Sequence, residues 1–226
     1  MEKQVEIRGI PLVKFKDKNV IDSIQKGHIW LNPVSMYRKA ENETGDTVVG
    51  DKFEAMWPIG EGIVHIPDES LSQQVVNGYL KTTHMDDYVF CILKMGGMDN
   101  EFYFTDEQKD KLREFDEEAL LIYDTTEFVQ RIENAAKSQG YELNHSIVNY
   151  YDPSTDNMNL LYDLVRGMEN IVFWKRDEYR YQQEIRFVIQ RGNLQDDHLV
   201  LEVGDISDIS MRLSIKDMLR VRMKRV

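Results

Sequence analysis

The 226-residue sequence lacks several features that mark common classes of protein. Its single cysteine, Cys91, excludes an internal disulfide and is typical of a chain that works in a reducing compartment. The longest apolar runs, as at 119–122, are too short for a helix that crosses a bilayer. The first residues lack the apolar core of a signal peptide. We therefore expect a soluble, cytoplasmic protein that does not associate with membranes.

The motifs of the best-known enzyme classes are also missing. The sequence contains no phosphate-binding Gly-x-x-x-x-Gly-Lys-Ser/Thr loop, no Gly-x-Gly-x-x-Gly and no Gly-x-Ser-x-Gly elbow. One cysteine and five scattered histidines do not make a zinc site, so we predict no metal. Cys91 stands in an apolar segment, where a buried and inert thiol is expected.

Acidic residues outnumber basic ones, which leaves a formal net charge of −12. Such a chain is repelled by phosphate backbones, so direct binding of nucleic acid is not expected. Residues 99–118 carry nine acids and three bases. They are interpreted either as a solvated helix face or as a nucleic-acid mimic that binds a basic groove on a protein partner. The basic residues 211–226 alternate with Leu219, Val221 and Met223, which predicts a final half-buried strand.

Apolar patterning predicts a folded domain, because hydrophobic residues make up 42% of the chain. Strands are predicted at 5–15, 28–32, 88–95, 141–151, 171–174, 184–191, 199–203 and 206–213, and helices at 18–26, 35–39, 105–121 and 126–138. Asp17 and Thr105 stand at helix-cap positions. Strands and helices do not alternate regularly. The fold class is therefore α+β, as a single domain over 1–226 with a mixed, mostly antiparallel sheet and a helical insertion at 99–140.

A polar stretch over residues 29–54 is the first candidate site. Its carboxylates include Glu41, Asp51 and Glu54, and Asn32 ends the strand predicted at 28–32. Loops carried by strands often hold functional groups. An ordinary exposed loop is the alternative interpretation.

The second candidate site lies at residues 173–186, where aromatic side chains alternate with cations. Gln182, Glu184 and Arg186 are two residues apart, so on a strand they share one face. One interpretation is an ion-paired sheet surface. The other is a pocket floor, in which Glu184 binds a ribose hydroxyl or stabilises positive charge on a sugar. Gln182 would orient the ligand, and Trp174, Tyr179 or Tyr181 would stack on a base.

Parts of these stretches resemble a widespread bacterial and phage family, DUF2971. The resemblance rests on Leu12-Val-Lys-Phe15, Gly27-His-Ile-Trp-Leu-Asn32, Lys175 and Tyr181-Gln-Gln-Glu-Ile-Arg186. It covers residues 12–54 and 171–189, and Gln182 stands where the family often has a glutamate. By this resemblance the protein would act in the cytoplasm of a bacterium, or of the host if a phage encodes it.

The order of elements is also similar to that of the ADP-ribosyltransferase superfamily. That resemblance implies an ADP-ribosyltransferase-like core, NAD as the substrate, and Glu184 with Gln182 as the catalytic residues. Lys14 stands where these enzymes have Arg or His, and no Ser-Thr-Ser motif is present. The residues that the resemblance assigns to binding are Lys14, Asn32, Tyr37, Arg38, Trp174, Lys175, Tyr181 and Arg186.

Three functions stay open from the sequence. The first is an enzyme that transfers ADP-ribose from NAD to a macromolecule or cleaves NAD. The second is a non-enzymatic acidic inhibitor that uses 99–118 to bind a nucleic-acid-processing or defence protein in phage–host conflict. The third is a nucleotide-binding module that recognises a base with Trp174 and Tyr181.

Overall fold

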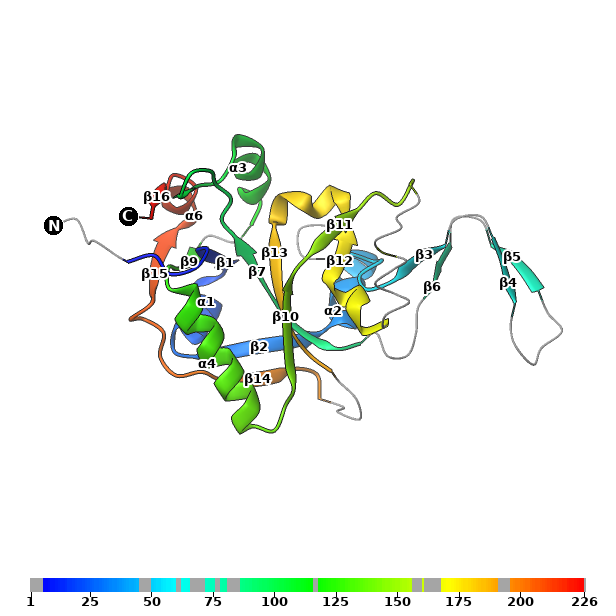
Figure 1. Cartoon of the computed structure of the whole chain (residues 1–226), viewed down its shortest axis with the longest axis horizontal. Helices are drawn as coiled ribbons and strands as arrows, with labels where there is room; N and C mark the ends of the chain where they lie inside the picture. The colour runs from blue at the N-terminus through cyan, green and yellow to red at the C-terminus, as the bar shows by residue number, and fades with distance from the viewer. Residues whose placement is uncertain are drawn as a thin grey trace. The chain divides into compact units, whose positions relative to one another are not determined.

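The structure is a computed structural model, and it describes residues 6–44, 50–59, 62–65, 72–75, 78–80, 86–115, 118–155, 160, 168–190 and 196–225 (Figure 1). These residues belong to two compact units that alternate along the chain. Unit 1 comprises Met1–Pro33, Asp87–Val148 and Glu178–Val226, and unit 2 comprises Val34–Asp86 and Asn149–Asp177. Helices and antiparallel sheets occur together, so the α+β class is confirmed.

An antiparallel sheet forms the centre of unit 1. Its strands follow the order β10-β13-β7-β1-β9-β15, and β2 joins β7 to β14. The bounds are β1 Leu12–Lys16, β2 His28–Pro33, β7 Tyr88–Lys94, β9 Glu118–Ile122, β10 Leu143–Ile147, β13 Glu184–Ile189, β14 Leu199–Glu202 and β15 Ser210–Ser214.

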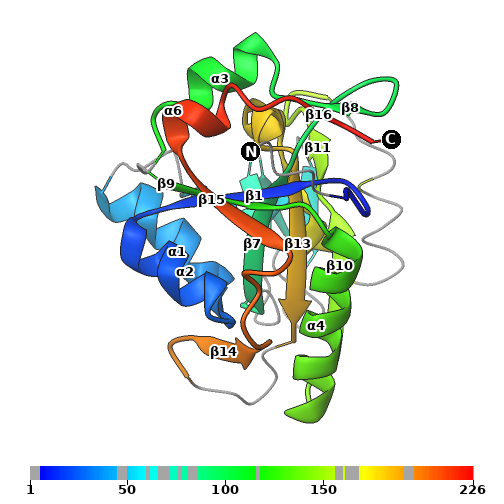
Figure 2. The ribbon, with the colours of Figure 1, turned by 90° about the vertical axis from the view of Figure 1, so that its left-hand side faces the viewer.

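Helices cover both faces of this sheet. α1 (Lys18–Gln25) and α4 (Thr125–Ser138) pack on the face that carries Leu12 and Phe187. α3 (Asp106–Leu112) and α6 (Ile215–Met218) pack on the opposite face, which carries Val13. In Figure 2, α3 and α6 lie above the crossing strands β1, β9 and β15, whereas α1 and α4 lie below them. Burial of each large aliphatic side chain in these two cores contributes roughly 1.5–3 kcal/mol.

Side chains cap the helices of unit 1 where the sequence places cap residues. Asp17 accepts hydrogen bonds from the Asn19 and Val20 N–H groups at the start of α1. Thr105 and Gln108 form a reciprocal capping box at α3. These contacts satisfy N–H groups that have no partner within the helix. Both predicted caps are confirmed.

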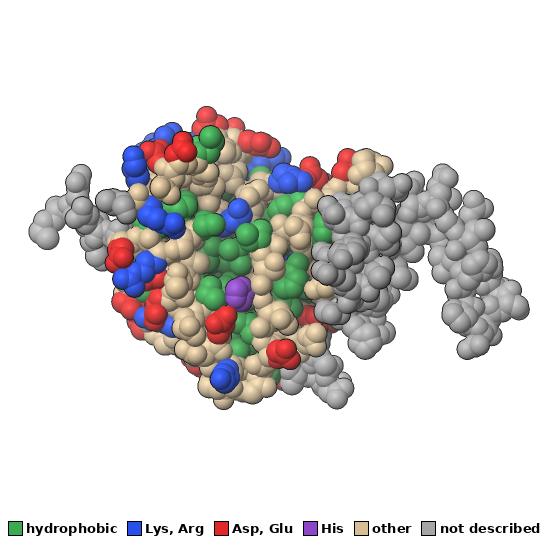
Figure 3. Space-filling model, viewed as in Figure 1, with side chains coloured by type: hydrophobic (Ala, Val, Ile, Leu, Met, Phe, Trp, Pro, Cys, Tyr) green, Lys and Arg blue, Asp and Glu red, His purple; other side chains and the backbone are tan. Residues whose placement is uncertain are grey.

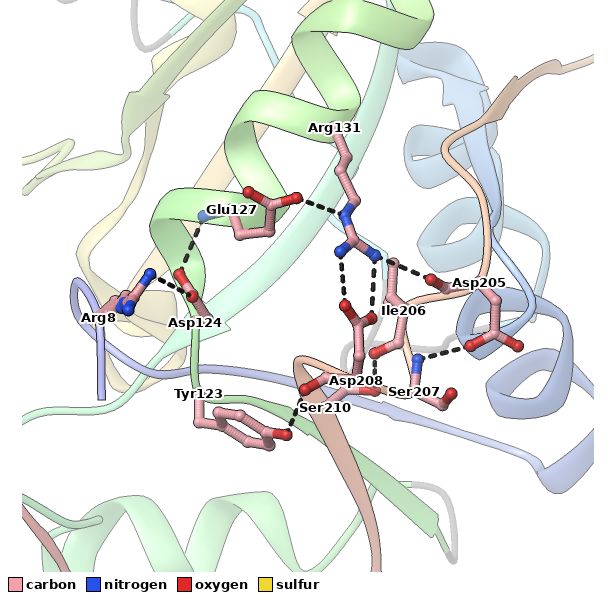
Figure 4. Close-up of polar contacts among 10 residues, drawn as sticks. All are labelled: Arg8, Tyr123, Asp124, Glu127, Arg131, Asp205, Ile206, Ser207, Asp208 and Ser210. Carbon is pink, nitrogen blue, oxygen red and sulfur yellow. Dashed lines mark hydrogen bonds and ion pairs between the residues drawn. The ribbon is translucent and has the colours of Figure 1, made fainter. Parts of the chain in front are cut away.

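A network around Arg131 connects α4 to the loop before β15 (Figure 4). The Arg131 guanidinium donates to both carboxylate oxygens of Asp208, at 3.0 and 2.6 Å, and to Glu127 at 2.8 Å. It also donates to the Asp205 carbonyl at 2.8 Å. The fork geometry of a guanidinium suits such bidentate contacts and holds the helix against the loop.

The predicted helical insertion at 99–140 is wrong. α3 ends at Leu112, and residues 118–122 form β9, which pairs with both β1 and β15. A short, continuously apolar run fits a strand buried on both faces as well as a buried helix, and its residues alone do not separate the two. Here the two neighbouring strands decide the conformation.

Several other predicted bounds differ from the structure. The predicted strand at 171–174 is the end of the 3₁₀ helix η2 (Met168–Phe173) followed by β12 (Trp174–Arg176). The predicted final strand is reduced to β16 (Met223–Lys224), which pairs with β8 (Glu101–Phe102). Residues 215–218 instead form α6, because Ser214 caps a helical turn there.

Unit 2 is built from short elements. Its described residues form α2 (Val34–Lys39), the π-helical turn η1 (Ala40–Thr44), two antiparallel strand pairs and one parallel pair. The pairs are β3 (Trp57–Ile59) with β6 (Gly78–Leu80), β4 (Gly62–His65) with β5 (Ser72–Val75), and β11 (Asn149–Tyr151) with β12. Tyr151, Leu160 and Trp174 pack together as a small core. η3 (Asp177–Gln182) follows β12 and leads to β13.

In the part of the chain that the structure describes, every helix is too short or too polar to cross a membrane.

Candidate functional site

Unit 2 contains a group of buried charged side chains, here named the ion cluster. Arg38, Asp51, Glu54 and Lys175 are each 4% exposed or less. Glu41 and Arg176 border them and are slightly more accessible. The ion cluster comprises Arg38, Glu41, Asp51, Glu54, Lys175 and Arg176.

The turn at 51–55 places the two most buried carboxylates of the ion cluster. The Asp51 side chain accepts a hydrogen bond from the Phe53 N–H at 2.9 Å, and the Asp51 carbonyl accepts one from the Glu54 N–H at 2.9 Å. Aspartate stabilises a tight turn in this way. The Asp51 N–H donates to the Tyr37 carbonyl at 3.2 Å, which fastens the turn to α2. Ala55 then adopts a positive φ of 50°, a strained backbone for a residue with a side chain.

Arg176 joins two of the acids. Its Nε and Nη2 lie 3.2 and 2.9 Å from Asp51 Oδ1, and Nη2 lies 3.6 Å from Glu41 Oε2. The guanidinium also lies over the Phe53 ring, 4.7 Å from its centroid, which adds a cation–π contact. Glu41 in turn accepts the Lys52 N–H at 2.7 Å. Hydrogen bonds therefore fix the carboxylates of both Asp51 and Glu41 on this side of the ion cluster.

Glu54 lies between the other two cations. Lys175 Nζ is 3.9 Å from Glu54 Oε2, and Arg38 Nη1 donates to the Glu54 carbonyl at 2.9 Å. Arg38 Nη2 lies 3.7 Å from Asp86, whose carboxylate caps the Ser35 N–H. Burial lowers the pKa of Arg38 from its ordinary value, although Asp86 and Glu54 act in the opposite direction.

Electrostatics single out Asp51 within the ion cluster. Burial and the neighbouring negative charge of Glu54 raise the pKa of the Asp51 carboxyl from 3.8 to about 6. Arg176 and Lys175 act in the opposite direction without cancelling that rise. A carboxyl group with a pKa near neutrality can both accept and return a proton, which is the property a general base needs.

The predicted catalytic residues Glu184 and Gln182 lie in unit 1. Glu184 is almost fully buried, and its Oε2 accepts a hydrogen bond from Arg186 Nε at 3.0 Å. Glu184 and Arg186 share one face of β13, as predicted. Gln182 does not, because it belongs to η3, and Gln183 separates it from the strand with a positive φ of 46°. The prediction of one strand face for all three residues is therefore wrong for Gln182.

Strand register places Lys14 on the other side of the sheet from Glu184. Glu184 pairs with Leu93, and Leu93 pairs with Val13, so these three side chains share a face. Lys14, the next residue, projects to the opposite face, where its Nζ donates to the Cys91 carbonyl at 2.5 Å. The structure does not bring Lys14 and Glu184 into one pocket.

The remaining predicted residues divide between the two units. Asn32 pairs with Val89 in unit 1, which puts it on the Glu184 face of the sheet but farther along the strands. Tyr181, also in unit 1, packs on the core beside Val13, and its hydroxyl accepts a hydrogen bond from Gln182. Tyr37, Arg38, Trp174 and Lys175 belong to unit 2, together with Glu41, Asp51 and Glu54. Trp174 is buried against Tyr151 and Leu160, so its ring is part of a core.

Arg176 is the functional candidate that the sequence analysis did not select. Its position next to Lys175, in a charged segment that follows a predicted strand, was the available signal. Among the described residues there is no group of three or more His, Cys, Asp or Glu side chains that could hold a metal ion.

Comparison with protein-family models found no matching family, and searches of curated proteins and of solved structures found no match either. Function is therefore inferred from this chain's own residues.

Proposed function

We propose that this protein is an enzyme that acts on a phosphate-bearing nucleotide and that the ion cluster is its catalytic centre. The observation that carries the proposal is the burial of Asp51 and Glu54 together among three cations, with the pKa of Asp51 raised to about 6. Burying charges is expensive, and groups with shifted pKa values concentrate at functional sites. NAD is the first candidate substrate, because it is the one that the resemblance to ADP-ribosyltransferases implies.

Five of the six members of the ion cluster have a role in this proposal. Arg38, Lys175 and Arg176 provide the positive charge that a pyrophosphate requires, and the two guanidinium groups suit bidentate contacts with its oxygens. In NAD cleavage the bond from ribose C1′ to the nicotinamide nitrogen breaks, and nicotinamide leaves with the bonding electrons. The oxygen of water or of an acceptor hydroxyl bonds to C1′, and Asp51 accepts its proton. Glu54 stabilises the positive charge that develops on the ribose.

Glu184 has a structural role in this proposal. Its buried ion pair with Arg186 and its position across the sheet from Lys14 support that assignment. The ADP-ribosyltransferase-like core and the catalytic use of Glu184 are the competing hypothesis, which the same experiment tests.

The test is nicotinamide release from millimolar NAD by the full chain, measured for the wild type and for single isosteric variants. Asp51→Asn and Glu54→Gln are expected to lower turnover by at least about 100-fold, because each removes a charged group from the reaction. Glu43→Gln is the matched control, since Glu43 is an exposed acid of η1 outside the ion cluster. It is expected to leave turnover unchanged.

Each alternative outcome has a definite meaning. Loss of turnover in Glu184→Gln alone, with that variant still folded, would move the catalytic centre to β13. If the wild type releases no nicotinamide and NAD does not raise its melting temperature, NAD is excluded as the substrate. Thermal stabilisation by NAD without turnover would indicate a nucleotide-binding module in place of an enzyme.

A further inference from the structure

A pocket separate from the ion cluster lies in unit 1, where α3 meets α6. Its volume is about 590 Å³, and it is lined by Lys109, Arg113, Ile215, Lys216, Leu219 and Arg220. Small-molecule sites in proteins commonly span about 300–1,000 Å³. The pocket is therefore large enough for an organic ligand.

The charge of the lining has the opposite sign to that of the chain. Four of the six lining residues are cations, although the protein carries a net charge of −12. Lys109 and Arg113 pair with Asp106 and Asp110 along α3, at 3.0 and 3.3 Å. Within the described part of the chain, Lys216 and Arg220 have no acidic partner within 4.0 Å. Two cations are thus available for an external anion.

In Figure 3, Lys and Arg side chains lie at the upper left, intermixed with Asp and Glu side chains. Arg222 and Arg225 flank β16 and lie over the rings of Tyr103 and Phe102. Acidic side chains lie beside these cations, since Asp106 and Asp110 belong to α3 and Asp217 belongs to α6, so the charge for an external anion comes from the lining of the pocket itself.

The floor of the pocket is apolar. Ile215 and Leu219 are four residues apart and so lie on one side of the last helical turn. Leu219 also packs in the core with Val13 and Leu112, which fixes the floor in place. None of the six described lining residues is aromatic, so the pocket offers no ring on which a nucleobase would stack. An aliphatic group fits this floor, and the long stems of the lysine and arginine side chains extend the apolar wall.

We propose that the pocket between α3 and α6 binds a small amphipathic anion, with an aliphatic chain on Ile215 and Leu219 and a phosphate or carboxylate head at Lys216 and Arg220. The acidic stretch 99–118 thus contributes two of its cations to an anion site. Every lining residue lies in unit 1 and every residue of the ion cluster lies in unit 2, so this inference does not depend on the proposed enzyme.

The experiment is calorimetric titration of the full chain with octyl phosphate below its critical micelle concentration. Octanol, which has the same chain without charge, and inorganic phosphate, which has the charge without the chain, are the ligand controls. The variant Lys216→Ala/Arg220→Ala removes both available cations. Lys111→Ala/Lys224→Ala is the matched control, because it removes the same charge from exposed positions outside the pocket.

Octyl phosphate is expected to bind the wild type and the control variant equally, and to bind Lys216→Ala/Arg220→Ala about tenfold more weakly, because two exposed cation contacts are lost. Octanol and inorganic phosphate are each expected to bind at least about tenfold more weakly than octyl phosphate. Equal affinity in the two variants, or equal affinity for inorganic phosphate and octyl phosphate, would overturn the proposal.

A second arm distinguishes a free ligand from a lipid head group. The wild type is sedimented with phosphatidylcholine vesicles that contain phosphatidic acid. Binding of octyl phosphate without cosedimentation assigns the pocket to a free molecule. Cosedimentation that is lost in Lys216→Ala/Arg220→Ala assigns the pocket to a membrane lipid. If the wild type neither binds octyl phosphate nor cosediments with the vesicles, the site is refuted.

Discussion

Buried charged residues in the two units are compensated in different ways. In unit 1, Glu184 and Arg186 form an ion pair on one strand face. In unit 2, burial and then the neighbouring charge of Glu54 raise the pKa of Asp51, even though cations surround the two carboxyl groups. A matched pair serves packing, whereas two adjacent carboxyl groups create a site that holds or releases a proton near neutral pH.

Replacing Asp51 with asparagine is expected to change how stability depends on pH. Folding raises the pKa of Asp51 from 3.8 to about 6, so the folded state binds this proton more tightly than the unfolded state. Ionised Asp51 therefore lowers stability above pH 6, and that cost disappears as the pH falls below about 4. Relative to the wild type, Asp51→Asn should gain stability between pH 4 and pH 7, by at most about 3 kcal/mol. Urea unfolding at several pH values measures this difference, and a difference that does not vary with pH would contradict the raised pKa.

Breaking the ion pair in β13 is expected to destabilise the fold strongly. Glu184→Gln removes the carboxylate that the nearly fully buried Arg186 guanidinium contacts. The expected loss is about 3–5 kcal/mol in the free energy of unfolding. The double variant Glu184→Gln/Arg186→Met, which removes both charges, should lose less than the single variant. If Glu184→Gln is as stable as the wild type, the pair does not hold the sheet and the structural role of Glu184 is wrong.

At the scale of elements, close approach between two backbone segments fixes the turn at which α1 ends and β2 begins. Gly27 follows α1 with a φ of +99°, and a Cβ atom there would overlap the backbone of Gly204. Val203 donates its N–H to the Gly27 carbonyl at 2.8 Å, so the two segments are fastened together at this point. Glycine is required here for conformation and for space.

Substituting Gly27 with alanine is expected to cost more stability than substituting Gly140. Both glycines have positive φ, but Gly140 follows α4 with open space around it. Gly140→Ala should cost about 1–2 kcal/mol from backbone conformation alone. Gly27→Ala should cost several kcal/mol, because either the chain near Gly204 moves or the turn opens. Chemical unfolding compares the two variants, and equal losses would show that the approach of Gly204 does not constrain the turn.

At the scale of the whole molecule, the two units are interleaved in the sequence. The chain leaves unit 1 after Pro33 and again after Val148, and returns at Asp87 and at Glu178. The second of these excursions, Asn149–Asp177, supplies Arg176 and so completes the ion cluster. Arg176 and its partner Asp51 are 125 residues apart in the sequence. Formation of the cluster therefore requires closure of a long loop.

Hydrogen exchange is expected to follow the strand order of the large sheet. β7 has β13 and β1 as neighbours and also pairs with β2, whereas β10 and β15 each end the order. Amides in β7 should exchange at least about tenfold more slowly than those in β10 and β15, because opening β7 breaks pairing on both sides. Mass spectrometry of peptides over 88–94, 143–147 and 210–214 measures the rates. Faster exchange in β7 than in the end strands would contradict the topology.

Local patterns in the sequence predicted much of unit 1. The apolar segment at 88–94, the amphipathic helices at 18–25 and 125–138, and the caps at Asp17 and Thr105 each follow from residue type and spacing. The strand at 118–122 was not predicted, because a continuous apolar run becomes a strand only when neighbouring strands pair with it.

The distinction between local sequence patterns and tertiary contacts also applies to the two candidate sites. Arg38, Glu41, Asp51, Glu54 and Lys175 could be selected from the sequence, as members of the polar stretches 29–54 and 173–186. Their grouping with Arg176 is a tertiary property, since hydrogen bonds and ion pairs join segments more than 100 residues apart. The separation of Lys14 from Glu184 is tertiary as well, because strand register determines the sheet face of each side chain. Residue spacing along a chain determines local conformation, but only pairing between distant segments determines which charges share a buried environment.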